Sequence, residues 1–209
     1  MQKIASREIV RKLIHLSSLI YPLLYLVLQD RQVMLFLTGA ILMLVLSVDV
    51  LRNLNAPFNI LFCRWFGASL RLHERKQRYN MHFAVTGSTY FMAGVVLTIW
   101  LFPKNIAILA ICVLIISDTC AALFGMAYGK SRLFGSHKSL EGFLAFLCSA
   151  GLISFVGSFY FQLHWLPLLL AVITTSLLEL FSDKLKCNDN LLIPVSYGFT
   201  VIVFANGFF

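Results

Sequence analysis

Long apolar runs constrain the fold of this chain more than any other feature. Seven runs of about 16–22 residues, each the length that spans a hydrocarbon core about 30 Å thick, follow one another between short polar breaks. Their approximate bounds are 13–28, 33–51, 83–102, 106–127, 143–163, 166–181 and 191–209. Only 12% of the 209 residues are charged, about half the share typical of soluble domains. The sequence therefore predicts an all-α polytopic membrane helix bundle with about seven transmembrane helices.

Basic residues predict the orientation of this bundle. Of the 17 lysines and arginines, 15 lie in alternate connections, counted from the N-terminal tail, and two lie in the others. Because short loops rich in these residues stay in the cytoplasm, we expect a cytosolic N-terminus. The same bias accounts for the net charge of +8 without a nucleic-acid partner. We expect one integral membrane domain over residues 1–209, with cytosolic loops at about 52–82, 128–142 and 182–190. Within the first loop, segment 56–72 is expected to be an interfacial helix or a re-entrant piece.

Four ionisable residues within the apolar runs are candidate functional positions: His15, Asp49, Asp118 and Glu179. Ionisable side chains are costly in a bilayer, so they usually face the bundle interior and serve a function. With the predicted orientation, all four lie in the cytosolic half of the bilayer, which favours a site open to the cytosol over a transport path. Three of them lie near helix ends, where a capping or pairing role is equally compatible. Asp118 lies deeper and is the strongest functional candidate.

A stripe of small residues follows Asp118. Ala121, Gly125 and Gly129 recur every four residues and form one smooth helix face, onto which another backbone or a ligand can pack closely. Helix packing alone accounts for the stripe, so both interpretations stay open. The Gly-Lys-Ser sequence that begins at Gly129 is not a P-loop, because that motif needs four residues between its glycines and a preceding strand.

The connection at 128–142 carries the densest polar chemistry. It combines lysines, an arginine, serines, a histidine and a glutamate with three glycines. Glycines let backbone N–H groups converge on an anion, and lysines supply charge for phosphate oxygens. Its glutamate, Asp118 and the acids of loop 182–190 could hold Mg²⁺ on such phosphates. The residues therefore favour a nucleoside triphosphate site, with a solvated basic loop as the alternative.

Two linked motifs carry a family resemblance. The first is Asp118-x-x-Ala-x-x-x-Gly125-x-x-x-Gly129-Lys130, and the second is Lys138-Ser139-Leu-Glu141-Gly142. Together they resemble the signature of the polyprenol, phytol and dolichol kinase family, which includes the CTP-dependent diacylglycerol kinase. Weaker elements agree along the chain, namely Arg11-Lys12-x-x-His15, Asp49-Val-Leu-Arg52, Thr86-Gly-x-Thr-Tyr90, Glu179, and Asp189-Asn190-x-x-Ile-Pro194.

The resemblance implies a CTP-dependent lipid kinase. Such an enzyme transfers the γ-phosphate of CTP, with Mg²⁺, to the hydroxyl of a membrane isoprenoid alcohol or of diacylglycerol. The implied catalytic residues are Asp118, Lys138, Glu141 and Asp189, of which the three acids would be metal ligands or one of them the base. The implied nucleotide-binding residues are Gly125, Gly129, Lys130, Lys138, Ser139, Gly142 and Asn190. Further candidates are His15, Asp49 and Glu179.

Two other functions stay open. Phosphatidate cytidylyltransferases, which make CDP-diacylglycerol from CTP and phosphatidate, have a related Asp…Gly-x-x-x-Gly-Lys…Lys-x-x-Glu-Gly stretch. Their C-terminal His-Gly-Gly and Asp-Arg block is absent here, where Asn188-Asp189-Asn190 stands instead, and this favours the kinase. A non-enzymatic membrane transporter would leave the one-sided polar cluster unexplained. The compact size of the chain favours a bacterial inner membrane, with the site facing the cytosol.

Overall fold

The computed structural model describes residues 2–67, 70, 85–133, 138–185 and 187–205. The predicted loops 52–82, 128–142 and 182–190 therefore lie partly outside the described residues. The helices, in chain order, are α1 (Gln2–Ser17), α2 (Ile20–Leu28), α3 (Arg31–Leu54), α4 (Ala56–Phe66), α6 (Gly87–Leu101), α7 (Lys104–Cys112), the π-helical turn η1 (Val113–Ser117), α8 (Asp118–Tyr128), α9 (Leu140–Tyr160), α10 (Trp165–Leu185) and α11 (Asp189–Ala205).

Seven apolar helical stretches match the seven predicted runs. Among the described residues, five are long and apolar enough to cross a membrane: Glu8–Leu28, Arg31–Leu54, Lys104–Tyr128, Leu140–Tyr160 and Trp165–Ser182. Two shorter apolar helices, Gly87–Leu101 and Asp189–Ala205, match the remaining two runs. The prediction of an all-α polytopic membrane protein is confirmed. The cytosolic N-terminus and the interfacial position of 56–72, whose first part forms α4, stay predictions.

Several helices begin at side chains that cap their free N–H groups. Asp30 precedes α3, and its carboxylate accepts from the backbone N–H of Gln32 and Val33 at 2.7 and 3.2 Å. Asn55 caps α4 through the N–H of Phe58 at 3.0 Å. Such caps satisfy donors that a helix start would otherwise leave unpaired. With these caps, α3 begins at Arg31 soon after α2 ends at Leu28, and α4 begins at Ala56 soon after α3 ends at Leu54.

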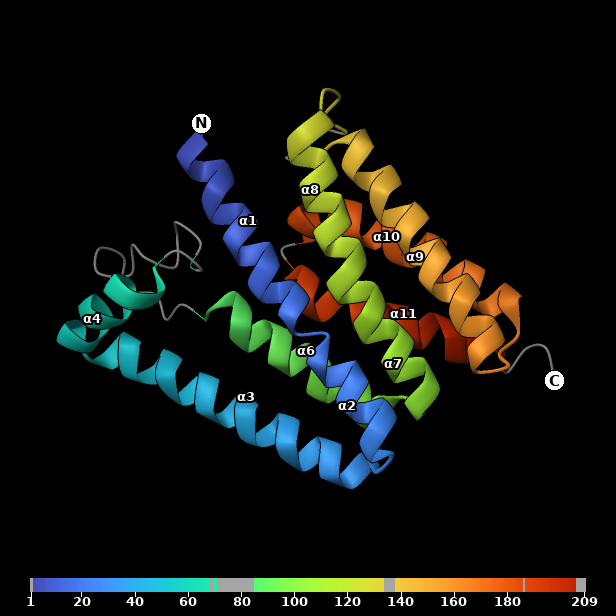
Figure 1. The fold of residues 1–209 in the computed structure, drawn as a ribbon, viewed down its shortest axis with the longest axis horizontal. Helices are drawn as coiled ribbons and strands as arrows, with labels where there is room; N and C mark the ends of the chain where they lie inside the picture. Colours follow the sequence, from blue (N-terminus) through green and yellow to red (C-terminus); the bar gives the residue numbers. More distant parts are fainter. Residues whose placement is uncertain (1, 68–69, 71–84, 134–137, 186, 206–209) are drawn as a thin grey trace.

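The first span is interrupted between α1 and α2, as Figure 1 shows. Pro22 has no N–H, so it cannot donate to the carbonyl of Ser18 four residues earlier. The chain turns more tightly there: Ser18 N donates to His15 O and Leu19 N donates to Leu16 O, both at 3.1 Å. The first span therefore consists of two helical pieces, α1 and α2, joined by this tight turn.

The continuous stretch α7–η1–α8 lies at the centre of the bundle. The side chains of α7 and η1 are almost all buried, with Ile111, Val113, Leu114 and Ile115 fully so. Helices α9 and α11 pack against this stretch, α10 packs on α9 and α11, and α3 packs on α6. In Figure 1, α1 and α3 diverge from the turn that joins α2 to α3, and α6 lies between them.

Helices α6 and α11 approach closely at the start of α11. A side chain at Gly94 would collide with the backbone carbonyl of Asn190. Pro194, four residues further along α11, lacks the N–H that would normally bond this carbonyl. The close contact fixes the start of α11, which carries two of the predicted site residues, against α6.

Candidate active site

Asp118 forms a buried polar cluster with two residues of α1, called here the Asp118 cluster. The Lys12 ammonium donates to Asp118 Oδ2 at 2.5 Å and to the Asp118 backbone carbonyl at 3.1 Å. The Nε2 atom of His15 lies 3.6 Å from the same carboxylate oxygen. Lys12 is only 3% exposed. An ionised aspartate within a span is thus accompanied by an opposite charge, which is how membrane interiors accommodate carboxylates.

The positions of these residues follow from local structure. Asp118 is the first residue of α8, directly after η1. A π-helical turn adds a residue to the helical repeat and so redirects the side chains that follow it. Lys12 and His15 are three residues apart on α1, and such a pair shares one face of a helix. The cluster therefore joins α1 to the central helix.

A cavity of about 200 Å³ lies beside the Asp118 cluster. Its walls come from α1, α2, α3 and α6, together with Asp118 and Asn190. The lining residues are Arg11, Lys12, Ile14, His15, Ser18, Tyr21, Ile41, Val45, Leu70, Thr86, Gly87, Ser88, Phe91, Met92, Asp118 and Asn190. Asn190, which lines the cavity, directly follows Asp189, a member of the second polar cluster of the bundle.

This second cluster, called here the Lys138 cluster, joins the α8–α9 loop to α10 and α11. The Lys138 ammonium donates to Glu179 Oε1 at 2.6 Å, to the Glu179 backbone carbonyl at 2.5 Å and to Ser182 Oγ at 2.9 Å. It also lies 3.2 Å from Asp189 Oδ2. The structure thus brings together three predicted residues that are 41 and 51 positions apart in sequence.

The carboxylates of the Lys138 cluster keep its lysine charged. Burial alone would lower the pKa of Lys138, but Asp189 and Glu179 outweigh it and raise the pKa above the usual 10.5. The side chain as a whole remains 18% exposed, so part of it borders the outside of the bundle. At neutral pH the cluster therefore presents a fixed cation beside two carboxyl groups.

The α8–α9 loop holds the remaining polar candidates. Ser139 pairs with Arg132 in an isolated antiparallel bridge, and its hydroxyl accepts from the N–H of Gly142 at 3.1 Å, so it caps α9. Glu141 Oε1 accepts from the backbone N–H of Lys130 at 3.1 Å. Within the described part of the chain, Glu141 Oε2 and Asp189 Oδ1 are buried oxygens without a hydrogen-bond partner.

The small-residue stripe of α8 packs against the start of α9. A Cβ atom added at Gly142 would lie 2.9 Å from the carbonyl of Ala121, and one at Gly125 would lie 3.2 Å from Ser139 Oγ. A Cβ atom added at Gly129 would lie 2.9 Å from the same Ser139 Oγ. These glycines therefore allow the two helices to meet, which agrees with the packing interpretation of the stripe. Their predicted contact with a nucleotide stays a prediction.

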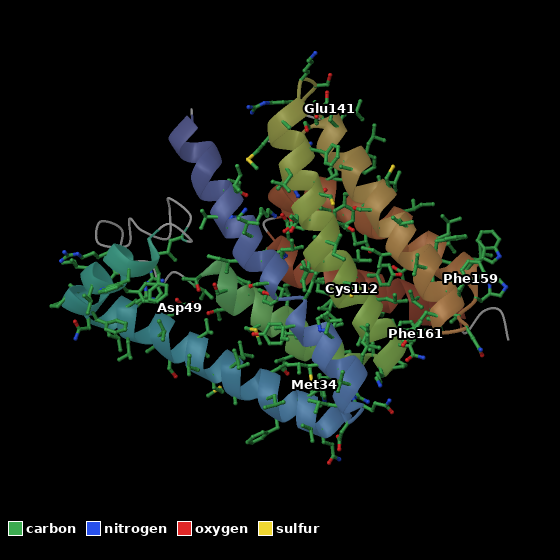
Figure 2. All side chains as sticks on the ribbon, viewed as in Figure 1. Met34, Asp49, Cys112, Glu141, Phe159 and Phe161 are labelled. Carbon is green, nitrogen blue, oxygen red and sulfur yellow. The ribbon has the colours of Figure 1, made fainter. Side chains whose placement is uncertain are left out.

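Asp49 belongs to a separate network at the end of α3. Its Oδ1 accepts from Arg52 Nη1 at 3.2 Å, and its Oδ2 accepts from the N–H and hydroxyl of Thr86 at 2.8 and 2.9 Å. The hydroxyl of Thr89 donates to the same oxygen at 2.7 Å. Figure 2 shows Asp49 at the left of the molecule and Glu141 at its top, so the two residues lie well apart. Both carboxylate oxygens are thus engaged in holding α3 to the start of α6.

The carboxylates only partly match the predicted metal set. Among the described residues, no group of three or more histidine, cysteine, aspartate or glutamate side chains could hold a metal ion. Asp118, Glu141 and Asp189 are therefore not gathered into one such group. Glu179 and Asp189, however, meet at Lys138, and one oxygen of Asp189 has no partner. Two carboxylates completed by phosphate oxygens are a usual Mg²⁺ environment, so this pair fits the ion in its donor chemistry.

Sequence reasoning did not assign roles to Lys12 and Ser182. Lys12 was quoted only within the Arg11-Lys12-x-x-His15 element, although its three-residue spacing from His15 indicates a shared face toward the bundle. Ser182 gives no such signal, because its contact with Lys138 depends on how α10 packs beside the loop.

Asn190, predicted to bind nucleotide, lines the cavity and donates its amide N–H to the Gly87 carbonyl at 3.0 Å.

Comparison with known proteins identifies the family. The model of the cytidylyltransferase family matches residues 4–185. The chain belongs to this family. It is also 36% identical over 196 residues to an uncharacterised protein of Rickettsia prowazekii, and the match covers 93% of each chain. No solved structure matches the chain.

Two further relatives of this family member are kinases by name. The chain is 34% identical over 147 residues to the CTP-dependent diacylglycerol kinase 1 of Saccharomyces cerevisiae, covering 68% of this chain and 47% of the kinase. It is 32% identical over 146 residues to the protein of the same name in Eremothecium gossypii, covering 68% and 43%. The chain thus spans about half the length of these kinases. The matches confirm the resemblance to the family of CTP-dependent lipid kinases.

Proposed function

We propose that this protein transfers the γ-phosphate of CTP to the hydroxyl group of a membrane lipid, either diacylglycerol or an isoprenoid alcohol. The proposal rests mainly on the ion pairs of Lys138 with Glu179 and Asp189. Asp189 is followed by Asn190, which lines the same cavity as Asp118. Charged groups suited to a triphosphate thus lie next to a membrane-embedded pocket suited to a lipid. The similarity to CTP-dependent diacylglycerol kinases supports the same reaction and favours diacylglycerol.

The proposed reaction is a direct displacement at phosphorus. The lipid hydroxyl oxygen bonds to the γ-phosphorus, and the bond from that phosphorus to the bridging oxygen breaks, so CDP leaves with the electron pair. The hydroxyl proton passes to a carboxylate that lies within hydrogen-bond reach. Asp118 is the carboxylate on the cavity wall, and Lys12 beside it compensates its charge.

Lys138 would bind the phosphates in this scheme. The three N–H donors of the ammonium already face oxygens of Glu179, Ser182 and Asp189, so Lys138 would exchange one of these acceptors for a phosphate oxygen. Mg²⁺, when bound by Glu179 and Asp189, would supply further positive charge for the phosphate oxygens. Because CTP comes from water and the acceptor from the bilayer, a site at this end of the bundle receives both. We expect this end to face the cytosol of a bacterial inner membrane.

The proposal is tested with purified protein, CTP labelled at the γ-phosphate, Mg²⁺, and dioleoylglycerol or geranylgeraniol as the acceptor. We expect label in the lipid fraction, and we expect Lys138→Ala and Asp118→Asn to reduce it at least about a hundredfold. Lys184→Ala, an exposed lysine on α10 outside the cluster, is the matched control and should keep the activity. Absence of lipid label with every acceptor would overturn the proposal.

A cytidylyltransferase reaction is the second candidate, because the family whose model matches is named for it. In that reaction the phosphate of phosphatidate attacks the α-phosphorus of CTP and pyrophosphate leaves. The same cation and carboxylates could bind the triphosphate in either reaction. Label at the α-phosphate would enter lipid only through this second reaction, so the two candidates are separable with phosphatidate as acceptor.

A further inference from the structure

Helices α1 and α3 both line the cavity beside Asp118, but each packs mainly on a different helix. Helix α3 packs mainly on α6, whereas α1 packs on α8. Ile41 and Val45, four residues apart on α3, line one side of the cavity, and Ile14 of α1 lines another. The side between α1 and α3 is therefore bounded by side chains of two separate helices.

The outer faces of these two helices are apolar. On α3, Met43 and Leu44 are 62% and 65% exposed, and on α1, Leu13 is 61% exposed. Both helices belong to stretches that are long and apolar enough to cross a membrane. Exposed apolar surface on such stretches is what a bilayer would cover. On this side, side chains of α1 and α3 thus stand between the cavity and the apolar outer surface of the bundle.

The inner end of the cavity is polar. Lys12, His15 and Asp118 lie there, and the buried Nε2 atom of His15 has no hydrogen-bond partner among the described residues. A buried nitrogen without a partner is unfavourable unless a ligand or water completes it. A molecule that fills the cavity would therefore be apolar along most of its length and carry a hydrogen-bonding group at one end.

We infer that this cavity is the acceptor site, which receives the hydroxyl end of the lipid sideways from the bilayer between α1 and α3. The inference rests on the proposed kinase function. The lipid hydroxyl lies beside Asp118 and His15, and its hydrocarbon runs outward past Ile41 and Val45. The nucleotide instead lies on the Lys138 cluster, which is reached from the loops at the end of the bundle.

The test is to fill the cavity with larger side chains. Ile41→Trp and Val45→Trp narrow the passage, whereas Leu44→Trp places the same residue on the lipid-exposed side of the same helix. The variants are assayed in detergent–lipid mixed micelles with dioleoylglycerol and γ-labelled CTP. We expect the two cavity variants to raise the KM for dioleoylglycerol about tenfold, with the KM for CTP changed less than about twofold. Leu44→Trp should leave both constants near those of the original protein.

Other kinetic results would overturn the inference. If the cavity variants raise the KM for CTP and not that for the lipid, the cavity holds the nucleotide. If they change neither constant, the acceptor binds elsewhere. Failure of the original protein to transfer γ-label to any acceptor is a different result, because it defeats the proposed function.

A second measurement needs no variant and no catalysis. The original protein is irradiated with a diacylglycerol that carries a diazirine in one acyl chain, and the labelled peptides are mapped. Labelling near Ile14, Ile41 and Val45 that excess dioleoylglycerol prevents would support the acceptor site. Labelling confined to other helices, or insensitive to excess dioleoylglycerol, would contradict it.

Discussion

Replacing Asp49 by alanine should destabilise the fold without acting on the chemistry. The carboxylate of Asp49 is 1% exposed and accepts hydrogen bonds from Arg52, Thr86 and Thr89. These contacts hold the end of α3 to the start of α6. The Arg52 side chain, itself fully buried, also lies over the ring of Phe62 on α4. Removing Asp49 therefore leaves a buried guanidinium without its carboxylate.

The expected loss follows from these contacts. Removing one partner of a buried ion pair destabilises a protein by about 3–5 kcal/mol. Each lost hydroxyl bond adds about 0.6 kcal/mol, the average for such bonds within membrane proteins. Arg52 keeps a contact to Asn59 at 3.2 Å, which limits the loss, so we expect about 3–5 kcal/mol in total. The double variant Asp49→Ala/Arg52→Ala should lose less than the sum of the single variants.

The free energy of unfolding can be followed by thiol labelling in mild detergent. The described cysteines are free, and Cys112 and Cys120 are partly buried in the central helix, so their labelling reports opening of the bundle. Asp30→Ala serves as the control, because this exposed cap should cost only about 1 kcal/mol. If Asp49→Ala keeps the stability of the original protein yet loses kinase activity, Asp49 acts in the reaction and our reasoning is refuted.

Three further predictions concern the packing, the charge and the metal requirement of the site. Gly142→Ala should lower the free energy of unfolding by about 1–3 kcal/mol, because its Cβ would lie 2.9 Å from the Ala121 carbonyl. Gly151→Ala on the same helix should leave the free energy of unfolding unchanged, because nothing lies within 4 Å of its added Cβ. Equal rates of thiol labelling in the two variants would contradict the close packing at Gly142. Lys138 has a pKa raised on folding, so its charge contributes stability below pH 10.5 that is lost as pH rises through the folded pKa. The difference in unfolding free energy between the original protein and Lys138→Ala should thus shrink as the pH rises above 10.5; a difference that stays unchanged there would count against this. Chelation with EDTA should abolish transfer and Mg²⁺ restore it, and Asp189→Asn should raise the half-activating Mg²⁺ concentration about tenfold, whereas an unchanged requirement would exclude Asp189 as a ligand.

The spans could be predicted from the sequence because a bilayer imposes a simple condition. Every backbone group within the hydrocarbon must be satisfied internally, so a long apolar run has to be a helix. This condition gives the number and the order of spans. It does not give the break at Ser18 and Leu19 that follows from Pro22, or the π-helical turn before Asp118. Such local irregularities depend on a few bonds and leave the average hydropathy unchanged.

The site could be predicted only in part, because its contacts join distant segments. The motifs predicted Lys138, Glu179 and Asp189 as separate candidates, and the packing of α9, α10 and α11 brings them to one ammonium group. The role of Asp49 stayed open between function and structure in the sequence. Its contacts with Thr86 and Thr89, 37 and 40 residues away, favour structure. No periodicity within one helix carries that information.

The most direct test of the kinase proposal uses CTP labelled with ³²P at the γ-phosphate and with ³H in the cytosine ring. The purified protein is given this nucleotide, Mg²⁺ and a mixture of dioleoylglycerol, geranylgeraniol and phosphatidate, and the two labels are counted in the extracted lipid. We predict ³²P in the lipid without ³H, because only the terminal phosphate is transferred. Appearance of ³H in the lipid without ³²P would show transfer of the cytidylyl group and contradict the kinase.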